Sequence, residues 1–147
     1  MKTKRSGFTL VEILIVVVIL GILAAIVIPQ FTEASTEAKL SALCTDLQTL
    51  RSQIELYKIQ HNDNPPEFAN FTLQMTGQTD IDGAVGTDYG PYMQKIPTNQ
   101  FNDKSNLDES GVIDNAGGWE YDDSTGSINA DDTYDEDGVD GFDHANL

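Results

Sequence analysis

The side chains that could do chemistry are mainly carboxylates, and they crowd the C-terminal end of the sequence. Residues 131–143 contain seven acidic side chains and two glycines. Acidic, glycine-containing loops suit Ca²⁺, which binds six to eight oxygen ligands in flexible geometry, although no frame of this stretch has the spacing of an EF-hand loop. A solvated acidic tail has the same composition. Composition alone therefore leaves two interpretations, calcium binding and a simple acidic tail.

No arrangement typical of an active site accompanies these acids. His61 and His144 are more than eighty residues apart, and the sequence places no serine or cysteine beside either to form a nucleophile–base pair. Capping or solvated roles fit the histidines better than a zinc site does. Cys44 is the single cysteine, and we predict a small apolar residue on a helix, with a reactive or intermolecular thiol as the alternative. We predict that the protein is not an enzyme.

One further carboxylate, Glu12, lies in an apolar setting near the N-terminus. The apolar run 13–28 follows it directly, and a charge inside hydrocarbon costs about 2.5 to 3.5 kcal/mol. The run contains no cation that could offset this cost. The partner of Glu12 must then be a chain terminus or a neighbouring subunit, unless Glu12 is protonated or stays hydrated among the head groups.

The segment around Glu12 is long enough to cross a membrane. As an α-helix, residues 8–28 would run about 31 Å, close to the roughly 30 Å of bilayer hydrocarbon. Lys2, Lys4 and Arg5 precede it, which predicts a cytoplasmic N-terminus. A cleaved secretory signal peptide is the alternative, but the apolar run continues past the small residues Ala24 and Ala25, and Glu12 would interrupt its apolar core.

An amphipathic helix follows Pro29. Its apolar residues alternate at spacings of three and four, which forms one stripe, and the run of turn residues 62–66 ends it. A coiled coil has the same spacing, but the stripe covers only about two and a half heptads and a domain follows. We therefore expect the stripe to pack on that domain; its members are Leu40, Leu43, Leu47, Leu50, Ile54 and Tyr57.

The rest of the sequence predicts short elements that complete an α+β fold. Residues 68–73 can form a short helix under the long one, and the alternating runs 117–122 and 127–130, separated by a glycine-containing turn, predict a β-hairpin. The fold is thus expected to be a helical spine on a small antiparallel sheet, in one domain. The expected core residues outside the spine are Phe68, Phe71, Leu73, Tyr92, Ile96, Phe101, Trp119, Tyr121 and Ile128.

Net charge excludes one class of partner. From Gln30 onward the sequence has 23 acidic and 5 basic residues, a formal charge of −18. Such a surface repels phosphate groups, so nucleic acid is not expected to bind.

The N-terminal string resembles a known processing signal. Residues 4–29, Lys-Arg-Ser-Gly followed by Phe-Thr-Leu-Val-Glu and the apolar run to Pro29, are similar to the class III signal of type IV pilins and of the pseudopilins of type II secretion. The resemblance implies that a prepilin peptidase cuts between Gly7 and Phe8 and methylates the new N-terminus at Phe8. It also implies that Glu12 pairs with the Phe8 amine of the adjacent subunit during filament assembly.

A second stretch resembles the major pseudopilins in particular. Residues 90–102 contain a similar Gly-Pro-Tyr, Lys, Pro pattern before a loop, although Gln100 stands where a proline is common. Major pseudopilins without a disulfide bind Ca²⁺ through a C-terminal loop, and this resemblance favours calcium over a simple acidic tail. The ligands it suggests are Asp132, Asp135, Asp137, Asp140 and Asp143.

The resemblance implies a domain organisation, a location and partners. Residues 1–7 would be a leader, 8–29 a membrane and assembly helix, and 30–147 a periplasmic pilin-like domain. The chain would wait in the inner membrane and then polymerise with its own copies and with minor pseudopilins on an inner-membrane assembly platform, for protein secretion across the outer membrane. A type IV pilin of a surface fibre, and a monomeric membrane-anchored calcium-binding module, are the alternatives.

Overall fold

The computed structural model describes residues 7–133 together with His144 and Leu147. The chain divides into two compact units, 1–38 and 39–147. One helix, α1 (Leu10–Gln60, 51 residues), contributes to both units. The predicted continuation of the helix past Pro29 is confirmed, because α1 is helical on both sides of that residue.

In the first unit α1 is apolar and uncovered. All the side chains from Phe8 to Ile28 are exposed, and Leu10–Ile28 is the one segment of the described chain that is long and apolar enough to cross a membrane. A helix that is apolar on every side needs an apolar environment all round it. None of the residues that the structure describes in this unit covers the segment, which fits a membrane anchor.

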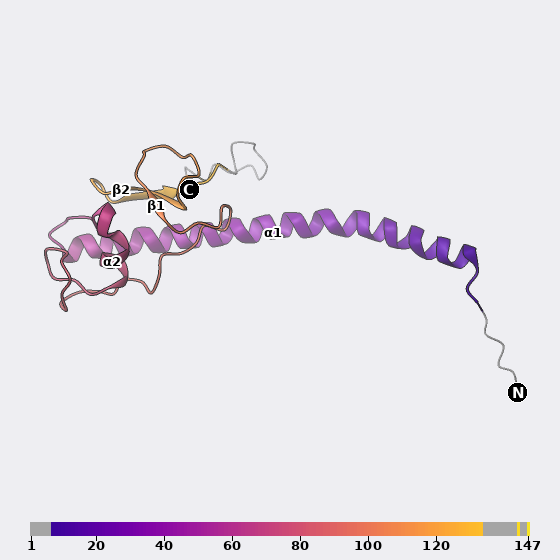
Figure 1. Ribbon diagram of the computed structural model, residues 1–147, viewed down its shortest axis with the longest axis horizontal. Helices are drawn as coiled ribbons and strands as arrows, with labels where there is room; N and C mark the ends of the chain where they lie inside the picture. The colour runs from indigo at the N-terminus through magenta and orange to yellow at the C-terminus, as the bar shows by residue number, and fades with distance from the viewer. Residues whose placement is uncertain (1–6, 134–143, 145–146) are drawn as a thin grey trace, which may run out of the picture. The chain divides into compact units, whose positions relative to one another are not determined.

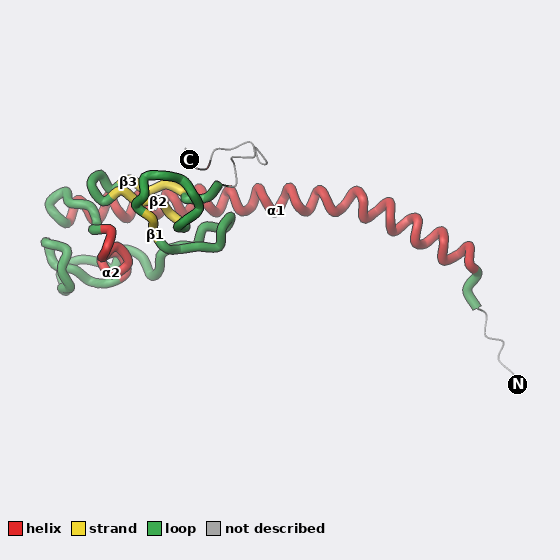
Figure 2. Tube along the Cα trace, turned by 45° about the horizontal axis from the view of Figure 1, so that its top comes forward, coloured by secondary structure: helices red, strands yellow, loops and turns green. Residues whose placement is uncertain are grey.

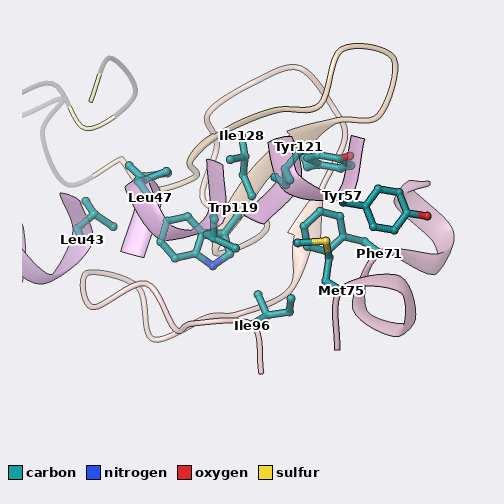
Figure 3. Packing of buried hydrophobic residues seen from close by; sticks show 12 residues of the cluster. Leu43, Leu47, Tyr57, Phe71, Met75, Ile96, Trp119, Tyr121 and Ile128 are labelled. Atoms are coloured by element: carbon teal, nitrogen blue, oxygen red, sulfur yellow. The ribbon is translucent and has the colours of Figure 1, made fainter. Parts of the chain in front are cut away.

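In the second unit α1 buries one stripe. Five of the six predicted stripe residues, Leu43, Leu47, Leu50, Ile54 and Tyr57, are at most 2% exposed, whereas Ile59 on the same helix is 77% exposed. Figure 3 shows Leu43, Leu47 and Tyr57 in one cluster with Trp119 of the sheet and Ile96 of a following loop. The stripe therefore packs on the chain's own domain, as predicted, and the coiled-coil alternative is not needed to explain its spacing.

The C-terminal end of α1 holds a buried histidine. Asn62 and Asp63 adopt positive φ values of 56° and 67°, a backbone conformation that ends helices, and the Asp63 N–H donates to the Lys58 carbonyl at 2.8 Å. His61 is 1% exposed, and its ring stacks on Tyr57 with 3.7 Å between centroids. The predicted capping role is confirmed, because His61 Nδ1 donates to the carbonyl of Tyr57 in the last turn of α1 at 2.8 Å. The solvated alternative was wrong, because the turn folds His61 back into the core.

Two short helices follow. These are the 3₁₀-helix η1 (Phe68–Asn70) and α2 (Phe71–Thr76), which confirm the predicted short helix. Phe71 and Met75 are buried, but Leu73 is 50% exposed. The short helix thus contributes one face to the core, and Leu73 lies on its other face.

The sheet has three strands in the order β1–β2–β3. The hairpin of β2 (Trp119–Asp122) and β3 (Ser127–Ala130) is antiparallel, as predicted, and pairs Tyr121 with Ile128. The third strand, β1 (Leu107–Asp108), runs parallel to β2, so the sheet is mixed rather than wholly antiparallel. Figures 1 and 2 show the strands beside the C-terminal part of α1, with long loops making up most of the remaining domain.

The sheet and the loops meet α1 around Trp119. Its indole N–H donates to the Pro97 carbonyl at 2.9 Å, and Trp119 itself is fully buried. Arg51 on α1 links the helix to the sheet edge, since its guanidinium donates to the carbonyl of Ile128 at 3.2 and 3.1 Å and to that of Leu147 at 2.6 Å. Apolar packing and the hydrogen bonds of Arg51 therefore hold β3 and Leu147 on the helix.

We predict that Leu47→Ala lowers the free energy of unfolding by about 2 to 5 kcal/mol, because it leaves a cavity in a fully packed stripe. Urea unfolding of the full chain in detergent micelles, followed by the fluorescence of Trp119, the single tryptophan, measures the change. Ile59→Ala is the matched control on the exposed face of α1 and should cost no more than about 0.5 kcal/mol. Equal costs for the two variants would contradict the packing described above.

Candidate functional site

The first candidate site is the N-terminal start of α1. Gly7 and Phe8 are exposed and precede the helix. A Cβ at Gly7 would meet nothing within 4 Å, and Phe8 is 84% exposed. Neither residue is therefore required by the packing of this chain, which leaves both open to another protein.

Glu12 has a partner that the sequence interpretation did not consider. The backbone N–H of Thr9 donates to Glu12 Oε2 at 2.8 Å, the Thr9 hydroxyl donates to the same oxygen at 2.7 Å, and the Glu12 N–H donates to Thr9 Oγ1 at 3.3 Å. This is a capping box, which satisfies donors that the first turn of a helix leaves without partners. The Thr-x-x-Glu spacing of Thr9 and Glu12 was the signal that could have found it.

The capping box does not neutralise the Glu12 carboxylate. Both donors of Thr9 reach Oε2, and Thr9 does not use Oε1. A helix N-cap is worth about 0.5 to 2 kcal/mol, less than the cost of about 2.5 to 3.5 kcal/mol for a charge in hydrocarbon. Thr9 can thus orient the Glu12 carboxylate, but a cation is still needed to offset its charge fully.

Of the five calcium ligands suggested by the sequence, one lies in the described part of the chain. Asp132 is 4% exposed; its Oδ2 accepts from Asn99 Nδ2 at 2.6 Å, and its Oδ1 lies 2.7 Å from His144 Nδ1. His144 is also buried, so the expectation of a solvated histidine was wrong here too. Asp135, Asp137, Asp140 and Asp143 lie outside the described residues, and their role as ligands stays a prediction.

A different set of carboxylates converges in the structure. Asp108 ends β1, Asp114 lies in the connection between β1 and β2, and Asp131 follows β3. One carboxylate oxygen from each lies within 4.8 Å of the other two. Three acidic residues so arranged could hold a metal ion. The sequence did not identify this set, because its members are separated by 6 and 17 positions with no motif between them.

Backbone donors fix the position of Asp131. Its Oδ1 accepts from the N–H groups of Asp114 and Asn115 at 2.9 and 2.8 Å, and its Oδ2 accepts from the N–H of Gly117 at 2.5 Å. Gly118, which follows Gly117 in the chain, lies so close to the carbonyl of Lys104 that a Cβ at this position would collide with it. The connection between β1 and β2 is thereby wrapped around the Asp131 side chain.

Glu120 on β2 is the fourth acid of this region. It stands opposite Asp108 in the parallel register of β1 and β2, and its Oε1 accepts from the Gly111 N–H at 2.6 Å. Burial raises the pKa of Glu120; the Gly111 donor opposes this, and the negative charges of Asp108 and Asp131 raise the pKa further. Ionised Glu120 is therefore unfavourable where it lies, unless a cation is present.

Comparison with known proteins places these features in a context. The model of the prokaryotic N-terminal methylation motif matches residues 2–28. The type II secretion system core protein G of Pseudomonas aeruginosa is 31% identical over 96 residues, which cover 65% of this chain and 68% of the relative. The protein of the same name from Vibrio cholerae is 31% identical over 114 residues, covering 76% of this chain and 77% of the relative.

A fimbrial protein is similar too. The type IV major fimbrial protein FimA of Dichelobacter nodosus is 33% identical over 94 residues, which cover 61% of this chain and 60% of the relative. No solved structure matches the chain significantly.

We predict that Glu120→Gln stabilises the chain at pH 7 in the presence of a chelator. Because its pKa is raised in the folded state, Glu120 contributes stability below its ordinary carboxyl pKa and loses it as the pH rises through the folded value. The gain from Glu120→Gln should therefore shrink as the pH falls toward 4, because the glutamate becomes mostly protonated in both states. Thermal melting between pH 4 and 8 measures it.

The exposed acid Asp88 provides the control for this effect. Asp88→Asn removes one negative charge from elsewhere in the domain and should leave the melting temperature nearly unchanged across the same pH range. A lower melting temperature for Glu120→Gln at pH 7 would contradict the unfavourable setting of the Glu120 carboxylate.

Proposed function

The chain belongs to the family of the type II secretion system core protein G, and from this we propose that it is a structural subunit that polymerises into a pseudopilus. The observation that carries the proposal is the N-terminal segment, which matches the methylation motif over residues 2–28 and leaves an apolar helix wholly uncovered. A subunit that exchanges lipid for copies of itself needs such a helix. Protein secretion across the outer membrane is then the role of the filament.

Processing removes the leader in this proposal. A prepilin peptidase cuts between Gly7 and Phe8 and methylates the Phe8 amine, which leaves 8–29 as the membrane and assembly helix and 30–147 as the pilin-like domain. The exposure of both residues ahead of α1 and the freedom of space around Gly7 support this. Gly7 is required by the peptidase rather than by the fold.

The location follows from the same segment. The chain spans the inner membrane once, with its N-terminus in the cytoplasm and its domain in the periplasm, and then joins a periplasmic filament. Its partners are other copies, minor pseudopilins and the inner-membrane assembly platform. The basic residues Lys2, Lys4 and Arg5 support the orientation, since basic residues are retained on the cytoplasmic side.

Glu12 gains a second partner during assembly. Thr9 holds its carboxylate through Oε2, and in the filament the carboxylate also pairs with the methylated Phe8 amine of the adjacent subunit. The Phe8 nitrogen becomes a charged amine only after cleavage. In an unprocessed chain it is part of the peptide bond to Gly7 and supplies no cation. Processing and assembly are thereby coupled through one charge.

A surface fibre is the second candidate function. Similarity to the type IV major fimbrial protein of Dichelobacter nodosus favours it, and the N-terminal segment would serve both filaments. Long extracellular fibres in electron micrographs would support the surface pilus, and loss of secreted proteins from cells that lack the chain would support the pseudopilus.

We predict that Glu12→Ala prevents assembly without preventing processing. A charge-assisted hydrogen bond is worth about 1.5 to 3 kcal/mol, so its loss at each subunit contact should lower the amount of filament by about tenfold or more. Shearing of filaments from cells, with mass spectrometry of the membrane fraction for cleavage after Gly7, measures both steps.

The control is Glu37→Ala, which removes an exposed carboxylate from α1 outside the apolar segment and should leave filaments intact. Normal filaments in Glu12→Ala cells would overturn the role assigned to Glu12. Absence of any self-association in wild-type cells would instead favour the monomeric anchored module.

Ca²⁺ is the cofactor in this proposal. The acidic segment 131–143 and the convergence of Asp108, Asp114 and Asp131 within 4.8 Å support it, because hard cations prefer oxygen ligands. The formal charge of −18 from Gln30 onward also has to be offset when many copies pack side by side, and a bound cation does this.

We predict that Ca²⁺ raises the melting temperature of the full chain in detergent micelles. A ligand at a hundred times its dissociation constant adds about 2.7 kcal/mol to the free energy of unfolding, and excess chelator should reverse the shift. Mg²⁺ at the same concentration is the control for simple charge screening. An unchanged midpoint at millimolar Ca²⁺ would contradict the calcium proposal.

A further inference from the structure

A groove of about 530 Å³ lies between the short helices and the sheet (Figure 1). Residues of η1 and α2 form one side of it, and Asn106 and Leu107, at the start of β1, form the other. None of its nine lining residues is charged. In a domain with 23 acidic and 5 basic residues, identical copies can approach one another at such a groove without direct charge repulsion.

The groove suits an apolar side chain. Its lining includes Phe68, Leu73 and Leu107, and Leu73 is 50% exposed there. The hydroxyl of Thr76, which also lines the groove, already donates to the carbonyl of Thr72 at 2.6 Å. An aliphatic side chain placed here would remove apolar surface from water without breaking that hydrogen bond.

The groove adjoins an open edge of the sheet. Strand β1 is an outer strand that pairs with β2, and the Asn106 carbonyl faces β2, because it accepts from the N–H of Trp119 at 3.3 Å. Backbone groups of successive strand residues alternate between the two sides, so the N–H and C=O of Leu107 point away from β2. Neither group has a hydrogen bond among the described residues. Such an edge is a template for pairing with another chain.

The loop after α2 carries a second open edge. Val85 is 75% exposed and forms an antiparallel bridge with Thr79. Its neighbours use their backbone groups on the side of Thr79: the N–H of Gly86 donates at 3.1 Å, and the C=O of Ala84 accepts at 2.9 Å. The N–H and C=O of Val85 therefore point to the opposite side, and neither has a hydrogen bond among the described residues.

We propose that, in the filament, Val85 of one copy pairs with Leu107 of the next copy and places its side chain in the groove. This inference rests on the filament proposed above. An open helical assembly is built from head-to-tail contacts, so each copy must present two different surfaces that fit one another. The groove with the edge of β1 is one such surface, and the loop around Val85 is the other.

The two edges match in backbone, charge and size. Each presents one N–H and one C=O, and two residues that face each other in an antiparallel pair exchange both bonds. The loop segment 83–87 is uncharged, like the groove. The small residues Ala84 and Gly86 beside Val85 let the backbone of the loop come close to β1, and the β-branched side chain of Val85 favours an extended backbone.

Two other exposed aliphatic side chains fit this groove less well. Ile59 is 77% exposed, but it belongs to α1, and a helix uses its backbone groups internally and cannot add to a strand edge. Val112 is 56% exposed, but Glu109 and Asp114 lie close to it in the chain. Their carboxylates would meet the acidic domain of the next copy.

Chemical crosslinking in intact cells tests the contact. In a Cys44→Ala background, Leu73→Cys/Val85→Cys places one thiol in the groove and one on the loop, and a short bis-maleimide joins two thiols that lie close together. Because every copy carries both thiols, we expect a ladder of dimers, trimers and longer chains in denaturing gels. Leu73→Cys/Gln94→Cys, with its second thiol on another exposed loop, is the matched control and should stay mainly monomeric.

A second variant measures the contact without crosslinking. Val85→Asp places a carboxylate in the groove of the next copy and should lower the amount of filament by about tenfold or more, because the charge is buried there without a partner. Gln94→Asp adds the same charge elsewhere and should leave the amount of filament unchanged. Both positions are exposed, so the melting temperatures of both variants should equal that of the wild type.

The possible failures can be told apart. Equal ladders in the two cysteine pairs, crosslinks only within single chains, or normal filaments in Val85→Asp cells would each overturn the contact. If wild-type cells form filaments in the same experiment, the filament proposal survives that result. Absence of filaments from wild-type cells would overturn the filament proposal and this contact with it.

Discussion

The apolar surface of Leu10–Ile28 is the constraint on which the rest of the molecule depends. Each large side chain in this segment is at least 42% exposed, and apolar surface in water costs roughly 25 cal/mol per Å². None of the described residues of the first unit covers it. The segment therefore fits a membrane anchor, and the second unit is the folded domain that this anchor carries.

The apolar segment can accommodate the Glu12 carboxylate because α1 begins beside it. Thr9 supplies two donors to one carboxylate oxygen, which orients the charge at the end of the segment, where the helix N-terminus also favours an anion. The arrangement stabilises the start of the helix and keeps the carboxylate near Phe8. A charge that is held but not neutralised is suited to finding a cation on another molecule.

Hydrogen bonds also hold two acidic side chains of the domain in place. Asp131 is surrounded by three backbone donors and Asp132 by Asn99 and His144, so both are buried at low cost. Glu120 is the exception, because one of its oxygens is buried without a donor. Among the residues that the structure describes, this is the one buried side-chain oxygen without a hydrogen-bond partner.

The sequence by itself determined the features that depend on local spacing. The apolar run, the stripe from Leu43 to Tyr57 and the β2–β3 hairpin could all be predicted, because each repeats with the period of its own element. The Gly7, Phe8 and Glu12 assignments come from a resemblance and remain to be tested. The capping box was equally local and was available in the Thr9–Glu12 spacing.

Only the tertiary structure decided which side chains meet. The parallel register of β1 and β2 sets Asp108 opposite Glu120, and the backbone wrapped around Asp131 brings Asp114 to them; neither leaves a periodic trace in the sequence. Burial of His61 and His144 likewise depends on a helix-ending turn and on contacts across the fold. Contacts between distant segments are set by packing of the whole domain, and for that reason spacing along the chain could not reveal the acidic cluster.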